Sequence, residues 1–182
     1  TTAKVETRMI EHTPQGVYEG VVLTRQQKVV VVSIARAGIL PSQVCFDLLN
    51  HAIEPDCVRM DHVFMNRKVN EQGQVIGVDL SGSKIGGPID DTQILFPDPM
   101  GATGVSMAQA VNIYKEEVEG TPRALIAMNL IVTPEYIRTM KEQHPDVSIY
   151  ALRLDRGLST QTALNTIPGT HPEEERGLNE HQ

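Results

Sequence analysis

A segment of small and hydroxyl-bearing residues follows an apolar run near the middle of the chain. Residues 98–106 read DPMGATGVS and come directly after the apolar residues 93–96. Small residues let a backbone fold closely around an anion, and successive N–H groups at the start of a helix favour a phosphate there. Thr103 and Ser106 add hydroxyl donors, and the Asp98 carboxylate can accept hydrogen bonds from vicinal hydroxyls. This segment therefore predicts a site for a sugar phosphate.

Other kinds of site have weaker support in the sequence. Neither G-x-x-x-x-G-K-[ST] nor G-x-G-x-x-G occurs, which excludes the two common phosphate-binding loops. The six histidines lack metal-ligand spacing, and no Ser/His/Asp or Cys/His set can be placed in one loop. We interpret Asp90 and Asp91 as solvated turn residues at the opposite strand end from Asp98, so no protein metal ligand is predicted. One alternative stays open, in which Gly101–Gly104 is an ordinary turn with Thr103 as a helix N-cap.

The elements that must position these residues alternate between strand and helix. Apolar, β-branched runs predict strands, and helical spacing between them predicts helices. The expected strands are 28–35, 58–65, 93–96, 123–132 and 147–152, and the expected helices begin near Pro41, Ser106 and Pro134. This alternation is typical of a parallel α/β sheet whose ligands bind at the C-terminal strand ends. In the first helix, Val44, Leu48 and Leu49 are expected to share one face.

Two longer segments do not fit this alternation. Residues 66–92 contain five glycines and one proline and are too long for a simple connection, which predicts a flexible hairpin or flap. Residues 156–182 are polar, with an acidic run at Glu173–Glu175, and are expected to form an insertion and a tail. We expect residues 1–182 to belong to a single domain, because 182 residues is close to the length of one domain.

Composition limits the partners and the compartment. With 23 acidic and 16 basic residues, the formal charge is −7, which disfavours nucleic acid and anionic membranes as partners. No apolar run approaches the roughly 20 residues that a membrane-spanning helix needs. Cys45 and Cys57 fit neither a zinc site nor a disulfide framework, so a reducing cytoplasm is expected.

Several motifs together resemble one family. The segment 98–106 is similar to the phosphoribosyl-diphosphate signature of the uracil phosphoribosyltransferases, in which a proline replaces the second acidic residue. SIARAG at 33–38 resembles the Arg-Ala-Gly loop of that family, and Phe64–Arg67 resembles the strand end that carries its second arginine. Residues 133–159 resemble its late helix, His-Pro-Asp turn and last strand, and Lys84 matches a lysine of the family. The resemblance covers residues 1–159.

The resemblance implies a fold and an activity. The fold would be that of the type I phosphoribosyltransferases, a parallel sheet flanked by helices with a flexible flap over the site. The reaction would move the 5-phosphoribosyl group of 5-phospho-α-D-ribose 1-diphosphate to uracil, giving UMP and diphosphate. Mg²⁺ would enter mainly through the diphosphate of the substrate, and the protein would form a homodimer or a higher homo-oligomer.

The same resemblance assigns roles to individual residues. Arg36 and Arg67 would stabilise the charge of the leaving diphosphate, with Lys68 as a rival to Arg67. Asp98 would hold the ribose hydroxyls, and residues 101–106 would bind the 5′-phosphate. The expected catalytic residues are thus Arg36, Arg67 and Asp98, and the expected substrate-binding residues are these three with Pro99, Met100, Gly101, Ala102, Thr103, Gly104, Val105 and Ser106.

The sequence also departs from the family pattern. Gly101 and Val105 stand where the family commonly has Leu and Gly, so Val105 must have a negative φ, as in a first helical turn. We expect an insertion at 160–176 before a repeat of a family motif at 177–181, which places the family's uracil-reading segment past residue 182. The helical N-terminal arm is expected to be missing or shortened. Two alternatives follow: a non-catalytic phosphoribosyl-diphosphate or nucleotide-binding regulator, and a phosphoribosyltransferase for another base.

Overall fold

A six-stranded sheet forms the centre of the computed structural model, which describes residues 5–69 and 75–159. The strand order is β5-β4-β3-β6-β7-β8. All neighbours are parallel except β5, which lies antiparallel to β4 at one edge. The strands are β3 (Val29–Ala35), β4 (Val58–Val69), β5 (Val75–Lys84), β6 (Gln93–Gly101), β7 (Ala124–Val132) and β8 (Ser148–Leu154).

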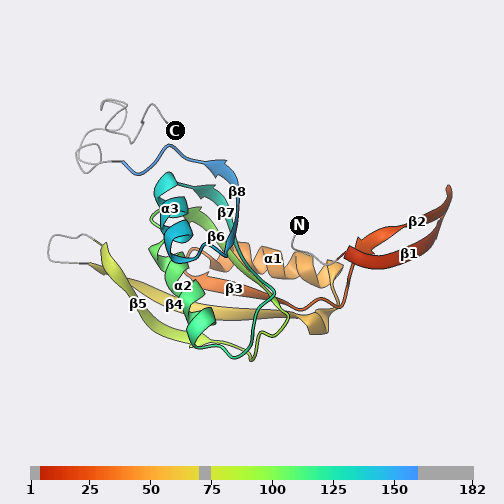
Figure 1. Cartoon of the computed structure of the whole chain (residues 1–182), viewed down its shortest axis with the longest axis horizontal. Coiled ribbons are helices and arrows are strands. Elements are labelled where there is room, and N and C mark those ends of the chain that lie inside the picture. The colour runs from red at the N-terminus through yellow and green to blue at the C-terminus, as the bar shows by residue number, and fades with distance from the viewer. Residues whose placement is uncertain (1–4, 70–74, 160–182) are drawn as a thin grey trace.

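Helices cover both faces of this sheet, as Figure 1 shows. The helices α2 (Val105–Glu116) and α3 (Pro134–Gln143) lie on one face, and α1 (Ile39–Ala52) lies on the other, followed by a short 3-10 turn at Pro55–Cys57. The predicted fold class is confirmed: a largely parallel sheet lies between two layers of helices.

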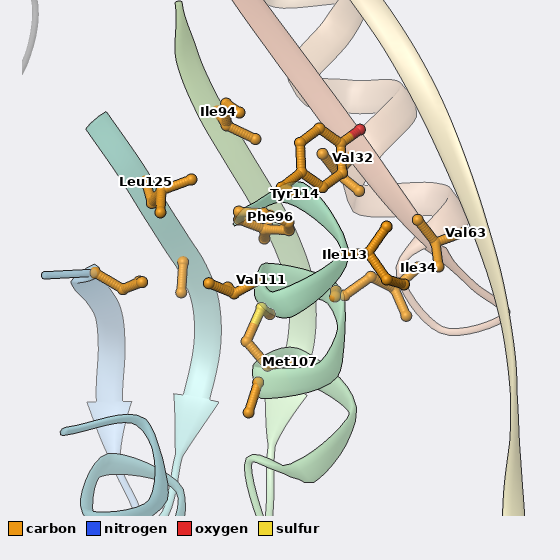
Figure 2. Packing of buried hydrophobic residues seen from close by; sticks show 14 of the residues in the cluster. Val32, Ile34, Val63, Ile94, Phe96, Met107, Val111, Ile113, Tyr114 and Leu125 are labelled. Carbon is orange, nitrogen blue, oxygen red and sulfur yellow. The ribbon is translucent and has the colours of Figure 1, made fainter. Parts of the chain in front are cut away.

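The buried core explains why the strand sequences are so apolar. Along β3, alternate residues such as Val30 and Val32 pack toward α2, while Val29 packs with residues beneath α1. A strand covered on both faces has no solvent side and therefore needs apolar residues at successive positions. Between β6 and α2, the rings of Phe96 and Tyr114 meet edge to face with centroids 5.5 Å apart (Figure 2).

Val44, Leu48 and Leu49, which were expected to share one face of α1, do not share one environment. The helix begins at Ile39, two residues before Pro41, and Phe46 and Leu49 make its contacts with the core. Val44 and Leu48 are instead 49% and 65% exposed. The predicted face is wrong because apolar residues lie on several sides of this helix. Their spacing therefore could not show which of them face the sheet.

Residues 66–92 form a hairpin in their described part. β4 does not end at Met65 but continues to Val69, and β5 pairs with it in antiparallel fashion, with residues 70–74 outside the described chain. The predicted hairpin is confirmed, while its flexibility stays a prediction. Asp90 and Asp91 lie in the following turn; Asp91 is exposed but bonds Arg123, with Oδ1 2.6 Å from Nη2.

The N-terminal residues form an unpredicted second sheet. The strands β1 (Val5–Thr13) and β2 (Gly16–Leu23) pair only with each other and project away from the central sheet (Figure 1). The sequence predicted only a missing or shortened helical arm here. The predicted insertion at 160–176 lies outside the described residues. No helix in the described ranges is long and apolar enough to cross a membrane.

Candidate active site

The strands β3 and β6 separate toward their C-terminal ends. Residues 29–31 pair with residues 93–95, and within these two fully described strands the pairing stops there. On its other side β3 remains paired with β4 up to Ala35 and Phe64. β4, which follows β3 in the chain, lies on one side of β3, and β6 lies on the other side. The strand order therefore reverses at β3, and open parallel sheets bind ligands at such a switch point.

A cavity of about 750 Å³ opens at the C-terminal ends of these strands. One wall consists of residues 34–37, at the end of β3 and in the turn after it. The hairpin contributes residues 64–66 of β4 and Ser81 of β5, and the remaining wall holds Asp98 of β6 and Ser106 of α2. The cavity therefore combines a guanidinium from one strand end, a carboxylate from another and two hydroxyls.

Arg36 reaches this cavity from a tight turn after β3. The Ala35–Arg36 peptide bond is cis. The Gly38 N–H donates to the Ile34 carbonyl at 3.0 Å, and the Ile39 N–H donates to the Arg36 carbonyl at 3.1 Å. Arg36 is exposed, and its guanidinium makes no ion pair within the described chain. A turn closed by backbone bonds thus presents a positive charge to the cavity.

Residues 98–106, which we call the phosphate loop, carry the chain from β6 into α2. The strand runs five residues past its predicted end at Phe96, because β7 pairs with it as far as Gly101. α2 begins at Val105 after Gly104, whose φ of +82° lies in the left-handed region that favours glycine. Val105 has a negative φ, as predicted, since Asp91 is the one described non-glycine residue with a positive value.

The alternative in which Thr103 caps α2 is wrong. Gly104 is the N-cap residue, and no side chain caps this helix. Thr103 is exposed, with its hydroxyl 3.5 Å from the Val105 nitrogen. No side chain of the N-cap residue satisfies the amide groups at the start of α2, and such groups can bind an anion.

The N-cap residue of α3 holds the phosphate loop by hydrogen bonds. Thr133 is the predicted N-cap, and its hydroxyl oxygen accepts a hydrogen bond from the Tyr136 N–H at 3.1 Å. The same hydroxyl donates to the Ala102 carbonyl, and the Thr133 N–H donates to the Gly101 carbonyl at 3.0 Å. One fully buried threonine thus caps α3 and fixes two successive loop carbonyls.

Asp98 is held in place by the neighbouring strand. It is the register partner of Asn129 on β7, whose side-chain Nδ2 donates to the Asp98 carbonyl at 3.0 Å. Asn129 is 6% exposed although it interrupts an otherwise apolar strand. A polar residue inside an apolar run is the sequence signal that could have marked Asn129 in advance.

The structure brings some of the expected site residues together and leaves others apart. Arg36, Asp98 and Ser106 line one cavity, whereas Thr103 does not line it. Arg67 does not stand at a strand end, because β4 continues to Val69 and Arg67 pairs with Val78 inside the hairpin. The role of Arg67, and the rivalry of the adjacent Lys68, stay predictions.

The hairpin also adds residues that sequence reasoning missed. Ser81 lines the cavity, and its hydroxyl donates to the Phe64 carbonyl across the hairpin at 3.0 Å. Asn66 lines the same wall. Nothing in the local sequence marked Ser81, since its place depends on the register of β5 against β4.

The site offers few ligands for a metal ion. Among the described residues, no group of three or more His, Cys, Asp or Glu side chains could hold one. Asp98 is the single acidic side chain on the described cavity wall. This set fits a Mg²⁺ ion that is bound mainly by substrate oxygens and water, and it does not fit a metal held by the protein alone.

Comparison with known structures shows where this fold occurs. A protein of Aquifex aeolicus superimposes with a TM-score of 0.62 over 87% of this chain and 68% of its own, at 18% identity. The adenine phosphoribosyltransferase of Trypanosoma brucei, in complex with AMP, pyrophosphate and ribose-5-phosphate, gives 0.52 over 81% and 64% at 11% identity. At these identities the likeness shows a shared fold, that of the type I phosphoribosyltransferases.

Sequence relatives identify the family. A uracil phosphoribosyltransferase of Dictyoglomus turgidum is 30% identical over 169 residues, which cover 92% of this chain and 74% of the relative. One of Thermococcus sibiricus is 28% identical over 168 residues, and this chain spans 66% of that relative's length. Residues 1–170 match the model of the uracil phosphoribosyltransferase family. The chain therefore belongs to the uracil phosphoribosyltransferase family.

Proposed function

We propose that this chain transfers the 5-phosphoribosyl group of 5-phospho-α-D-ribose 1-diphosphate to uracil, giving UMP and diphosphate. The observation that carries the proposal is the placement of Arg36 and Asp98 on two walls of one cavity beside the phosphate loop. A sugar phosphate with a second anionic group presents charges and vicinal hydroxyls that match this arrangement.

The arrangement supports a dissociative transfer. The bond between ribose C1 and the diphosphate oxygen breaks, and its electron pair leaves with the diphosphate while the ribose becomes oxocarbenium-like. The uracil nitrogen then forms the new bond to C1 and releases its proton to solvent. Arg36 stabilises the charge that develops on the diphosphate, because a fixed cation in a cavity acts without reorganising water. The phosphate loop anchors the 5′-phosphate and Asp98 holds the ribose hydroxyls, so remote binding energy aligns C1 with the incoming nitrogen of uracil.

Mg²⁺ would accompany the diphosphate substrate. A divalent ion supplies Lewis-acid stabilisation to the leaving oxygens. Asp98 is the side chain on the described cavity wall whose carboxylate could bind the ion or its water ligands. We propose that Arg67 adds a second positive charge when the hairpin lies over the site, where it would also exclude water.

We also propose that the protein works as a homodimer or a higher homo-oligomer in the cytoplasm. Leu40, Val44 and Leu48 form an exposed apolar row on α1, and a two-stranded sheet such as β1–β2 is marginal without further packing. The unpaired Cys45 and Cys57 agree with a reducing compartment. Light scattering of wild type and of Leu48→Glu tests the assembly, with a smaller particle expected for the variant.

Base specificity is tested by turnover. Purified protein is incubated with the diphosphate substrate, Mg²⁺ and one of uracil, hypoxanthine, guanine, adenine or orotate, and nucleotide formation is measured. Turnover with uracil alone supports the proposal. Turnover with a different base would make the chain a transferase for that base, and tight substrate binding without turnover would make it a non-catalytic regulator.

A further inference from the structure

The pairing of β3 with β6 stops short of the cavity, although both strands continue. The last pair is Val31 with Leu95, whereas β6 stays paired with β7 well beyond this point. Ile34 of β3 and Asp98 of β6 come after the last pair, and both line the cavity. The gap between the two strands therefore separates the strand end that leads to Arg36 from the strand that carries Asp98.

A proline stands at the first position past the paired region where β6 would donate to β3. The Gln93 N–H donates to the Lys28 carbonyl at 3.0 Å. Because every second residue of a strand turns its N–H to the same neighbour, the same register assigns the Val32 carbonyl to an N–H at position 97. Pro97 has no N–H, and its ring occupies the place of that hydrogen. This ladder bond therefore cannot form.

The start of α1 binds the carbonyl groups of β3 that lie beyond the last pair. The Ser42 hydroxyl donates to the Val32 carbonyl at 3.4 Å, and Ser42 is fully buried. Two residues further along β3, the Ile34 carbonyl accepts from the Gly38 N–H at 3.0 Å. Both carbonyls lie on the side of β3 that faces β6, because they alternate in step with the Lys28 carbonyl. The end of β3 thus needs no donor from β6.

The turn after β3 also lies against Pro97 itself. A Cβ atom added at Gly38 would stand 3.1 Å from the Pro97 carbonyl oxygen and 2.7 Å from that of Ile34. Gly38 has an ordinary φ of −71°, so the close approach of the backbone, and not its conformation, requires a glycine here. The turn that presents Arg36 is therefore seated on the residue that precedes Asp98.

We propose that Pro97 is a positioning residue for the transfer: by stopping the β3–β6 ladder, it sets the spacing between Arg36 and Asp98 that lets one substrate reach both. The proposal rests on the proposed function, in which Arg36 acts on the diphosphate and Asp98 holds the ribose. Paired strands lie about 4.8 Å apart, which leaves no room for a ligand between their ends. UMP contains no diphosphate, so its binding does not depend on this spacing.

A substitution that restores the missing donor tests this role. Pro97→Ala returns an N–H to β6. Pro55→Ala is the control, because Pro55 is exposed in the 3-10 turn before β4, at the opposite edge of the sheet. Both changes loosen the unfolded chain in the same way. The kcat/KM for the diphosphate substrate is measured with uracil and Mg²⁺, together with the calorimetric Kd for UMP.

Pro97→Ala should separate these two quantities. The kcat/KM should fall about tenfold or more, because a small displacement of groups that align a substrate lowers the rate strongly. The Kd for UMP should stay close to the wild-type value, and Pro55→Ala should keep both. Equal losses in kcat/KM and in UMP affinity would show general damage to the site, and an unchanged kcat/KM would show that Pro97 does not set the spacing. Either result overturns the proposal.

A double-mutant cycle tests the ladder itself. Ser42→Ala should lower the melting temperature, because it removes a donor from the buried Val32 carbonyl. In the Pro97→Ala background the same change should lower it less, since the restored N–H at position 97 can donate to that carbonyl. Equal decreases in the two backgrounds, or a Pro97→Ala variant that does not fold, would show that this proline does not stop the ladder and would overturn the proposal.

Failure of the proposed function would give a different result. If the wild-type protein forms no nucleotide from the diphosphate substrate with any base, the proposed function fails and the positioning role fails with it. If it turns over with a base other than uracil, the spacing is tested with that base. The cycle needs no substrate, so in both cases it still decides whether Pro97 ends the β3–β6 pairing.

Discussion

Asp61 of β4 accepts a hydrogen bond of 2.7 Å from the hydroxyl of Tyr114 on α2. The same buried carboxylate accepts two bonds from Arg59, at 3.0 and 3.1 Å, and one from the Gly86 N–H at 3.0 Å. Asp61 is 1% exposed, so its charge depends on these donors. The carboxylate thereby joins a strand, a helix and the segment that follows the hairpin.

Removing this tyrosine hydroxyl should destabilise the fold. Tyr114→Phe takes one donor from a buried carboxylate, and hydrogen bonds to charged groups contribute about 1.5–3 kcal/mol. We expect the free energy of unfolding, measured by urea titration monitored by circular dichroism, to fall by about that amount with an unchanged m-value. A loss below about 0.5 kcal/mol would show that Arg59 and Gly86 already satisfy Asp61.

A second polar cluster joins α2 to the end of α3. Lys115 Nζ lies 2.6 Å from Asp146 Oδ1 and 3.3 Å from His144 Nδ1, and His144 Nε2 lies 3.0 Å from the Ala108 carbonyl. Nε2 therefore carries the proton of the neutral ring, and Nδ1 accepts from Lys115. Burial lowers the pKa of His144 most, and the Lys115 charge adds to this, although the Ala108 carbonyl and nearby acids oppose it.

This cluster predicts a loss of stability in mild acid. The unfolded chain takes up a proton at His144 near pH 6.5, while the folded chain resists it, so stability falls as the pH drops below about 6.5 through the folded pKa. We expect the melting temperature to fall between pH 7.5 and 5.5, and to fall less in His144→Gln, which does not titrate. His51→Gln, at an exposed position on α1, should keep the wild-type pH dependence. An unchanged slope in His144→Gln would contradict the assignment.

The strands that are buried on both faces could be predicted from the sequence. A strand covered on both faces must be apolar at successive positions, so Val29–Ala35 was recognisable without its neighbours. The exposed row on α1 was not recognisable, because an apolar residue that faces solvent looks like one that faces the sheet. β1–β2 was missed because its strands pair only with each other and leave apolar residues such as Val17, Val21 and Leu23 exposed, so they do not show the pattern of a buried strand.

Site residues could be predicted where they follow an apolar run directly. Arg36 follows the apolar residues of β3 and Asp98 those of β6, and neighbouring parallel strands bring their C-terminal parts together. Ser81 reaches the site through the register of β5 against β4, which no local pattern specifies. The end of the strand that carries Arg67 was misplaced, because a parallel strand that continues into a hairpin has no visible end in the sequence.

Arg36 should matter more for turnover than for product binding. Arg36→Ala removes a cation from the place proposed for the leaving diphosphate. UMP does not contain this diphosphate group. Losing one donor to a transition-state anion costs on the order of 3 kcal/mol, or about a hundredfold in kcat/KM, whereas Kd for UMP should change little. Arg25→Ala, an exposed arginine before the N-terminal end of β3, should leave both unchanged. Equal losses in turnover and in UMP affinity would show that Arg36 does not act on the diphosphate.

Asp98 is the side chain on which the sugar assignment depends. Asp98→Asn keeps the size of the side chain, replaces one acceptor oxygen with a donor and removes the charge. The substitution keeps the Asp98 backbone carbonyl, to which Asn129 donates, so the fold should survive it. Loss of charge-assisted bonds to the 2′- and 3′-hydroxyls should weaken UMP binding by roughly 1.5–3 kcal/mol and leave the 2′,3′-dideoxy analogue unaffected.

The control for this substitution is Asp56→Asn, an exposed carboxylate in the turn before β4, at the opposite edge of the sheet. It should bind both nucleotides as wild type does. If Asp98→Asn still prefers UMP to the dideoxy analogue as strongly as wild type, the ribose hydroxyls are held by another group. A carboxylate in that cavity would then serve the diphosphate and its Mg²⁺ instead of the sugar, and raising the Mg²⁺ concentration should restore turnover to Asp98→Asn.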